Sequence, residues 1–299
     1  MCRIVVATFV ISLLFLPVAS QAATVDVSGS TAGWEILSYP YTPQPDYLND
    51  HQTGIPEGDI VGNHGAGNEP AIYTQFDDWG TADNTDGTFG VRVRLGDDSG
   101  PAGYSNYFFF GIDVNFDQQL DIAIGYKGKN PTKVGIWEFG TGLNESPQTT
   151  SVVVPSIAAY DNTPVDGDNF SFIPVDATSD PTATNYDLYG DGNDMFLSFS
   201  IPFADIVAAL AGIGHTGFND GVSVAYVIGT STQENAYNQD LGGPDGEINS
   251  PELWSDIKAI SSYRAINPHV PEPSSIALVF GGLVSFGAMR RRRRRQAVV

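Results

Sequence analysis

Tyr104-Ser105-Asn106-Tyr107-Phe108-Phe109-Phe110-Gly111-Ile112-Asp113-Val114 is the most apolar stretch between the two ends of the chain. Aromatic and β-branched side chains are enriched in β-strands, where they pack well on a pleated surface. A short apolar run bounded by turn residues is typical of a buried strand. The stretch therefore predicts a central strand in a β-sheet.

Segments on both sides of this stretch alternate between apolar and polar residues, as half-buried strands do. In Val91 to Leu95 the apolar side chains share one face, and we expect Arg92 and Arg94 to point outward. Further strands are predicted at Trp34 to Tyr39, Ala71 to Phe76, Leu120 to Tyr126, Lys133 to Phe139, Ser151 to Val154, Phe170 to Val175, Met195 to Ile201 and Val222 to Ile228.

Helical periodicity is nearly absent from the chain. One helix is predicted from Pro202 to Ala211, because proline is favoured in a first helical turn and Gly212 can end the helix. About ten short strands separated by turn residues predict an all-β fold. We expect a single β-sandwich or jelly-roll-like domain at residues 23–260, followed by a linker at residues 261–269.

The chain ends in three unlike pieces. Val270, Pro271, Glu272, Pro273 and Ser274 form an extended start, and residues 275–289 form an uncharged run that predicts a short transmembrane helix. Six arginines follow, and the positive-inside rule keeps them in the cytoplasm, so that the rest of the chain lies outside: Arg290, Arg291, Arg292, Arg293, Arg294 and Arg295. The alternative is a buried core helix with a basic tail.

This order of pieces resembles the PEP-CTERM sorting signal, and Pro271, Glu272 and Pro273 match its motif residue by residue. The family occurs on exported proteins of Gram-negative-type bacteria that make extracellular polysaccharide. The resemblance implies recognition and processing by an integral-membrane exosortase. It covers Val270 to Val299 and implies nothing about the fold or activity of the remaining chain.

Met1 to Ala22 has the layout of a secretory signal peptide, with Arg3 before an apolar run and small residues before Ala23. We expect signal peptidase to remove it; an N-terminal membrane anchor is the alternative. The only cysteine, Cys2, would leave with it, so the mature chain would have no disulfide. The expected route is export across the inner membrane and a transient membrane anchor, then the cell surface or the extracellular space.

The chain between these two ends is strongly acidic. Only 7 of its 14 basic residues lie there, against 34 of its 35 acidic residues, which gives residues 23–270 a net charge of about −27. Such a charge excludes a nucleic-acid partner, because phosphates need a basic surface. Most of the acids are aspartates, which favour turns and cation sites; solvated turns would explain them equally well.

The best candidate for a metal site follows the central strand. Asp113, Asn115, Asp117 and Asp121 occupy the first, third, fifth and ninth positions of a calcium-loop pattern. Gln118 stands where a glycine is usual, and Ile124 where a bidentate glutamate is usual. Calcium is therefore a candidate cofactor, and the alternative is a polar hairpin turn.

A second and weaker candidate resembles the later half of an EF-hand loop, with Asp245, Glu247, Asn249 and Glu252 as possible ligands. Its first half fits poorly, because Asp240 is one residue out of register. A third group, around Asp187 and Asp194, reads as a plain Asp-Gly turn.

No catalytic motif is recognised, and no histidine has a partner at zinc-ligand spacing. The leading hypothesis is a non-enzymatic surface or matrix protein. A carbohydrate-binding module for extracellular polysaccharide is the first alternative; it needs exposed aromatic rings, and burial of all four tryptophans would argue against it. A polysaccharide hydrolase or lyase is the second, and it needs two carboxylates in a cleft.

Overall fold

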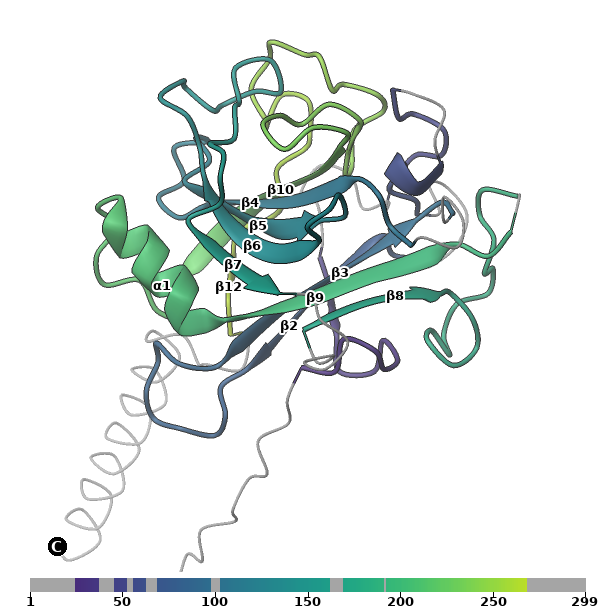
Figure 1. The fold of residues 1–299 in the computed structure, drawn as a ribbon, viewed down its shortest axis with the longest axis horizontal. Helices are drawn as coiled ribbons and strands as arrows, with labels where there is room; N and C mark the ends of the chain where they lie inside the picture. Colours follow the sequence, from purple (N-terminus) through teal and green to yellow (C-terminus); the bar gives the residue numbers. More distant parts are fainter. Residues whose placement is uncertain are drawn as a thin grey trace, which may run out of the picture.

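The computed structural model describes residues 25–37, 46–52, 56–62, 69–97, 103–161, 169–190 and 192–267. Two antiparallel sheets face each other, with a short helix at one end of the sandwich (Figure 1). The all-β sandwich expected from the sequence is therefore confirmed. The predicted signal peptide, the sorting segment 270–274, the predicted transmembrane helix and the arginine cluster lie outside the described residues.

The first sheet has five strands in the order β1-β2-β3-β9-β8. Neighbouring strands are antiparallel throughout. Its members are β1 (Glu35–Ile36), β2 (Ile72–Asp77), β3 (Thr88–Leu95), β9 (Met195–Pro202) and β8 (Phe170–Pro174).

The second sheet has seven strands, six of them in the order β11-β10-β4-β5-β6-β7, and β12 also pairs with β10. The predicted central strand is confirmed, because β4 lies between β10 and β5. Its members are β11 (Asp240–Leu241), β10 (Ser223–Ser231), β4 (Tyr107–Asp113), β5 (Ile122–Lys127), β6 (Lys133–Glu138), β7 (Ala158–Asp161) and β12 (Arg264–Ala265).

The main core lies between the two sheets and is rich in aromatic rings. Phe108 of β4 packs against Phe199 of β9 with ring centroids 6.0 Å apart, and Phe110 packs against Phe89 of β3 at the same distance. These rings bury a large apolar area and favour tilted or edge-to-face contacts. The paired sheets are held together mainly by this contact.

Alternate residues of β4 point the other way, into a second core on the outer face of the seven-stranded sheet. Phe109 packs there against Trp137 of β6, at a centroid distance of 5.4 Å. Loops cover this face, and one of them brings Trp254, whose indole nitrogen donates to the Asn144 carbonyl oxygen at 2.8 Å (Figure 1, upper part). The continuous apolar sequence of β4 thus follows from burial on both faces.

The outer face of the five-stranded sheet is also covered, which corrects one expectation from the sequence. Arg92 and Arg94 are both completely buried rather than exposed. The N-terminal segment 25–34 and the loop after β8 lie over them. Strand alternation predicts which side chains share a face, but it cannot predict that a further segment will cover the polar face.

Each buried arginine is compensated by the segments above it. Arg92 donates to the Val27 and Gly29 carbonyl oxygens at 3.0 and 2.9 Å, and its guanidinium carbon lies 4.5 Å from the centre of the Trp34 ring. Arg94 forms ion pairs with Asp194 at 2.5 Å and with Glu69 at 3.3 Å. Burial raises the pKa of Asp194 to about 6, although the Arg94 charge opposes this shift.

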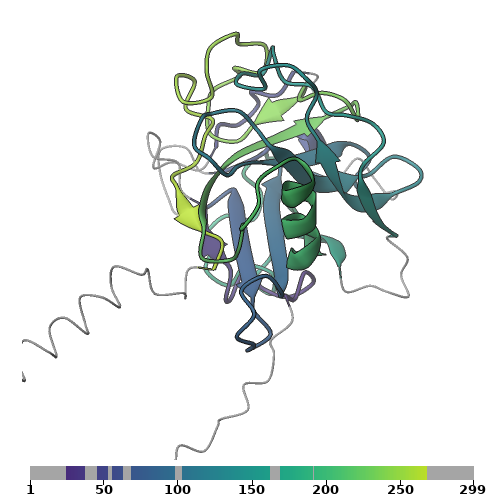
Figure 2. The same ribbon diagram turned by 90° about the vertical axis from the view of Figure 1, so that its left-hand side faces the viewer.

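Helix α1 (Phe203–Gly212) agrees with the predicted helix to within one residue at each end. Phe203, Ile206 and Leu210 are buried on one face and join the main core. Figure 2 shows the helix packed along one end of the sandwich, where it shields the ends of β3 and β9. Within the described residues, no helix is both long and apolar enough to cross a lipid bilayer.

The extent of one predicted strand and the start of the predicted linker differ from those expected. The predicted strand at Ser151 to Val154 is reduced to one bridge between Val152 and Phe139. Residues 261–267, expected as linker, contain β12 and contribute Ile266 to the main core. The body therefore continues to at least Asn267, because backbone pairing with β10 extends past the last apolar run.

Replacing Arg94 with methionine should lower the free energy of unfolding by about 3–5 kcal/mol, because Asp194 and Glu69 would stay buried without a counter-charge. The exposed Lys129→Met variant removes the same charge and should change stability by less than about 0.5 kcal/mol. Urea unfolding followed by tryptophan fluorescence measures both. Equal effects of the two variants would contradict the role given to the buried network.

Candidate functional site

The predicted calcium turn is a compact loop between β4 and β5 whose side chains bond to its own backbone. Asp113 is buried and accepts backbone N–H bonds from Asn115, Phe116 and Gln118, at 3.2, 2.7 and 3.0 Å. Phe116 and Gln118 have positive φ angles of 65° and 67°. Such angles are uncommon for non-glycine residues. The Asp113 carboxylate therefore holds an unfavourable turn in place.

The other carboxylate oxygens of this turn are also engaged, whereas Oε1 of Gln118 is buried without a hydrogen-bond partner. Asp121 accepts the Val114 N–H at 2.8 Å through one oxygen, and its second oxygen lies 2.8 Å from Nε2 of His215. Asn115 and Asp117 are exposed and bond to each other. Both oxygens of each buried carboxylate thus have protein partners, as a polar hairpin turn requires. Calcium binding by these four residues stays a prediction.

The second predicted group lies on an exposed loop. The four side chains concerned are all exposed: Asp245, Glu247, Asn249 and Glu252. Asp240, which was out of register with the EF-hand pattern, is instead almost completely buried at the start of β11. In the third group, Asp194 pairs with Arg94, and Asp187 caps a turn by accepting the Gly190 N–H.

A different group of carboxylates meets where two distant segments touch. Asp46, Asp50 and Asp59 come from the segment 46–62, and Asp240 comes from β11. In Figure 1 the segment 46–62 lies in dark blue at the upper right, beside one end of β3. Backbone bonds fix it there: the Val61 N–H donates to the Arg94 carbonyl at 3.0 Å, and the Gln52 N–H donates to the Gln239 carbonyl at 2.8 Å.

These four residues are called the carboxylate cluster below. One oxygen each of Asp46, Asp50 and Asp240 lies within 4.8 Å of the other two, a spacing that one metal ion could bridge. Asp46, Asp59 and Asp240 are at most 1% exposed, whereas Asp50 is only partly buried.

Backbone N–H groups orient every member of the cluster. Asp46 accepts from Gly243 at 2.7 Å, Asp50 from Gly246 at 3.0 Å, and Asp59 from Asn49 at 2.9 Å. Asp240 accepts from Ile60 at 2.6 Å and from Leu241 at 2.7 Å. These bonds use both oxygens of Asp240 but only one oxygen of each of the other three residues.

Three buried oxygens of the cluster accept no hydrogen bond: Oδ2 of Asp46, Oδ1 of Asp50 and Oδ1 of Asp59. Nδ1 of His51 lies 3.0 Å from the last of these, but the geometry does not make a hydrogen bond. Burial raises the pKa of Asp50 to about 7, and burial with the neighbouring carboxylates raises the pKa values of Asp46 and Asp240 well above the ordinary range. These raised pKa values mean that, without a cation, burial and mutual repulsion oppose the charged forms of these carboxylates.

Sequence analysis missed this cluster because its members are far apart in the chain. Asp46 and Asp50 are four residues apart, Asp59 follows nine residues later, and Asp240 comes from another loop. No calcium-loop spacing connects them. The loop before Ala71 gave no signal of its own, because its three aspartates are no denser than those of the body as a whole.

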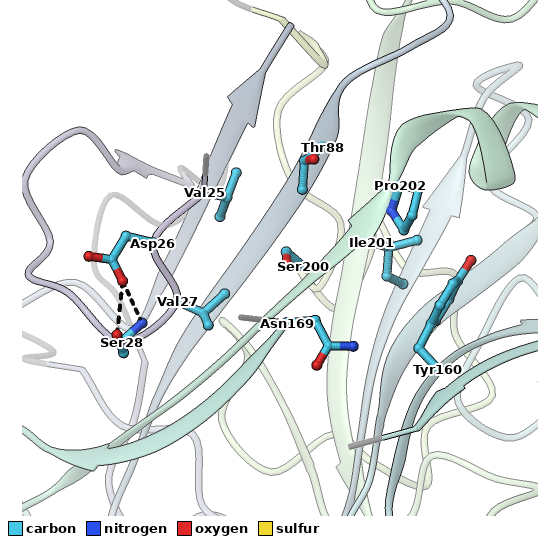
Figure 3. A pocket seen from close by; sticks show the side chains of 10 residues that line it. All are labelled: Val25, Asp26, Val27, Ser28, Thr88, Tyr160, Asn169, Ser200, Ile201 and Pro202. Atoms are coloured by element: carbon cyan, nitrogen blue, oxygen red, sulfur yellow. Dashed lines mark hydrogen bonds between the residues drawn. The ribbon is translucent and has the colours of Figure 1, made fainter. Parts of the chain in front are cut away.

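A cavity of about 430 Å³ opens on another part of the sandwich (Figure 3). Asp26 and Ser28 lie on one side of it, Asn169 and Tyr160 on the other, and Thr88 and Ser200 lie between them. Asp26 accepts from the Ser28 backbone and hydroxyl, both at 3.0 Å. The Tyr160 hydroxyl donates to Asp205 at 2.5 Å. The wall thus combines hydroxyl, amide and carboxylate groups and one aromatic ring with four apolar residues, namely Val25, Val27, Ile201 and Pro202.

Three of the four tryptophans are buried, namely Trp34, Trp137 and Trp254. Trp79 is 43% exposed, and its indole nitrogen donates to the hydroxyl of Thr88 at 3.2 Å. Thr88 is one of the residues that line the cavity, so Trp79 bonds to the cavity wall without itself lining it. The condition set against carbohydrate binding, burial of all four tryptophans, is therefore not met.

The body defines the class of the protein as an all-β sandwich with covered outer faces. The family described as the PEP-CTERM protein-sorting motif matches residues 269–294, which confirms the resemblance seen in the tail. The chain is thus an exported protein that carries an exosortase sorting signal. Comparison of the chain with curated proteins gives no match, and comparison with solved structures gives none either.

Replacing Asp113 with asparagine should lower the free energy of unfolding by about 1–3 kcal/mol in the presence of a chelator, because the amide has one acceptor oxygen for three backbone N–H groups. Asp117→Asn, at an exposed position of the same turn, should change it by less than about 0.5 kcal/mol. Urea unfolding measures both values. A loss of stability that appears only when calcium is added would instead mark Asp113 as a metal ligand.

Proposed function

We propose that this protein is a non-enzymatic component of the cell surface or extracellular matrix, delivered there by exosortase. The observation that carries the proposal is the match of residues 269–294 to the PEP-CTERM sorting motif. Signal peptidase would remove Met1 to Ala22 first, and the tail would hold the chain in the membrane until it is processed. A calcium-stabilised body is part of the same proposal.

Properties of the body support a role outside the cell. Its net charge of about −27 over residues 23–270 favours solubility in a polysaccharide-rich surrounding. It contains no cysteine after Cys2, so an oxidising compartment cannot cross-link it. Loops cover the outer faces of both sheets, which leaves little apolar sheet surface for unwanted association.

Replacing Pro271, Glu272 and Pro273 together with alanine should leave most of the chain in the membrane fraction, because the processing enzyme would lose its recognition segment. Ser274→Ala, next to the motif, is the control and should be released as the unchanged protein is. Fractionation followed by intact-mass measurement of the released chain tests this. Equal release of the triple variant would contradict the sorting route.

A second candidate function is binding of extracellular polysaccharide. The observation that favours it is a cavity with polar groups and one aromatic ring in its wall, together with the exposed Trp79, which bonds to the lining residue Thr88. Sugars are commonly bound by hydroxyl and amide groups together with an aromatic ring, and a volume of about 430 Å³ suits a small saccharide unit. A hydrolase or lyase has less support, since the described lining includes one carboxylate, Asp26, where a pair is needed.

Trp79→Ala and Asn169→Ala should each weaken binding of the cell's own polysaccharide by up to about tenfold, because one aromatic or hydrogen-bonding contact contributes about 1 kcal/mol. Phe116→Ala is the matched control, since Phe116 is 41% exposed but does not line the cavity. Retardation of the protein in gels containing the polysaccharide measures the effect. Equal weakening by all three variants, or no retardation of the unchanged protein, would contradict this second function.

A further inference from the structure

The carboxylate cluster differs from the other buried acids of the described chain because four carboxylates meet in it and no lysine or arginine ion pair involves them. The ion pairs that lysine and arginine make in the described chain involve other carboxylates, such as Asp194, Glu69 and Glu234. Among the described residues, the basic side chain paired with the cluster is His51, whose Nδ1 lies 3.0 Å from Oδ1 of Asp59. Burying unpaired carboxylates is strongly unfavourable unless they are protonated, paired or bound to a metal.

The cluster also differs from the predicted turn at Asp113. In that turn both oxygens of Asp113 and Asp121 have partners. In the cluster, Asp46 and Asp59 are completely buried, and each has an oxygen that accepts no hydrogen bond. Single acceptors without a donor also lie on Glu57, Gln75 and Gln118, but the cluster holds three of them, and their grouping calls for an explanation. A bound cation supplies one.

We propose that Asp46, Asp50 and Asp240 bind one calcium ion, and that Asp59 contributes the fourth negative charge beside it. Nothing in the tail motif assigns such a site. The inference deepens the proposed function and depends on it only for the place where the protein meets calcium, which is outside the cell. Binding itself is a property of the folded body.

The chemistry of the site fits calcium better than softer metals. All the converging atoms are carboxylate oxygens, which calcium and magnesium prefer, whereas zinc favours histidine and cysteine. Calcium–oxygen distances of about 2.3–2.6 Å place ligands on opposite sides of the ion up to about 5 Å apart. The three carboxylate oxygens lie within 4.8 Å of one another, which agrees with this ligand-to-ligand distance. Asp50 is only partly buried, so the ion can enter past it.

The ion would join two parts of the chain that are far apart in sequence, namely the segment 46–62 and the turn after β11. Asp46 and Asp50 already receive N–H bonds from Gly243 and Gly246, so the segment 46–62 and the turn after β11 are held in register. Neutralising the repulsion between their carboxylates would tighten this connection over the ends of β3 and β10. Calcium would therefore stabilise the folded body once it is exported.

The test is titration of the full-length chain, purified in detergent and freed of metal with a chelator, with calcium chloride in a calorimeter. We expect one ion per chain with a Kd of about 10⁻³ M or lower, as in extracellular calcium modules. At calcium about 100-fold above this Kd, Tm should rise by about 5–10 °C. Magnesium at the same concentration should raise Tm less. No binding heat with identical melting curves, or tighter binding of magnesium, would overturn the proposal.

The Asp46→Asn, Asp50→Asn double variant keeps an oxygen for each of the Gly243 and Gly246 N–H groups and replaces both free oxygens with NH2. It should bind calcium at least about 100-fold more weakly, because metal sites depend strongly on ligand charge. Its Tm in chelator should equal or exceed that of the unchanged protein, since two buried charges are removed. This Tm separates loss of binding from loss of folding.

The matched control is Asp117→Asn with Glu252→Gln, which removes two exposed carboxylates from the two calcium loops predicted by sequence. Its calcium affinity should be unchanged. Binding that survives in the Asp46/Asp50 variant and is lost in the control would overturn the proposal in favour of those loops. Because release from the membrane is measured separately, a failure of calcium binding and a failure of exosortase sorting are distinguishable.

Discussion

The structure depends on excluding water from both faces of β4 and its neighbours. Phe108 and Phe110 point into the core between the sheets, while Phe109 points into the core under the outer loops. At about 25 cal/mol per Å² of apolar surface, each of these rings contributes a few kilocalories per mole. A strand that is apolar on both sides cannot sit at a solvated face. The loops around Trp254 are therefore an integral layer of the fold.

Covering the sheets creates a second requirement, because polar groups buried under the covering segments need partners. On the five-stranded sheet the requirement is largely met within the chain: Arg92 bonds to carbonyl oxygens of segment 25–34, although its Nη1 has no hydrogen-bond partner, and Arg94 pairs with Asp194 and Glu69. At the carboxylate cluster it is met only in part, by backbone N–H groups. The buried arginines and the carboxylate cluster therefore differ in how far neighbouring groups balance their charge.

Local patterns predicted most of the strands, the helix and the sorting tail. Alternation in Val91 to Leu95 identified a strand correctly, because the period of two is a property of the backbone itself. The same pattern gave a wrong prediction for Arg92 and Arg94, which are buried rather than exposed. Alternation does not show which segments cover the outer face of the sheet. The Asp113 turn shows a related limit: calcium-loop spacing and a turn capped by its own carboxylate have the same sequence appearance.

The sequence by itself determined the route of the protein, its acidic character and its all-β class, because these follow from contiguous motifs, composition and short-range periodicity. Only the tertiary structure decided which polar residues are buried and which carboxylates meet. Asp240 joins Asp46 and Asp50 because β11 pairs with β10 while the segment 46–62 docks along the end of β3. Contacts of that kind depend on how distant segments pack, and no local spacing records them.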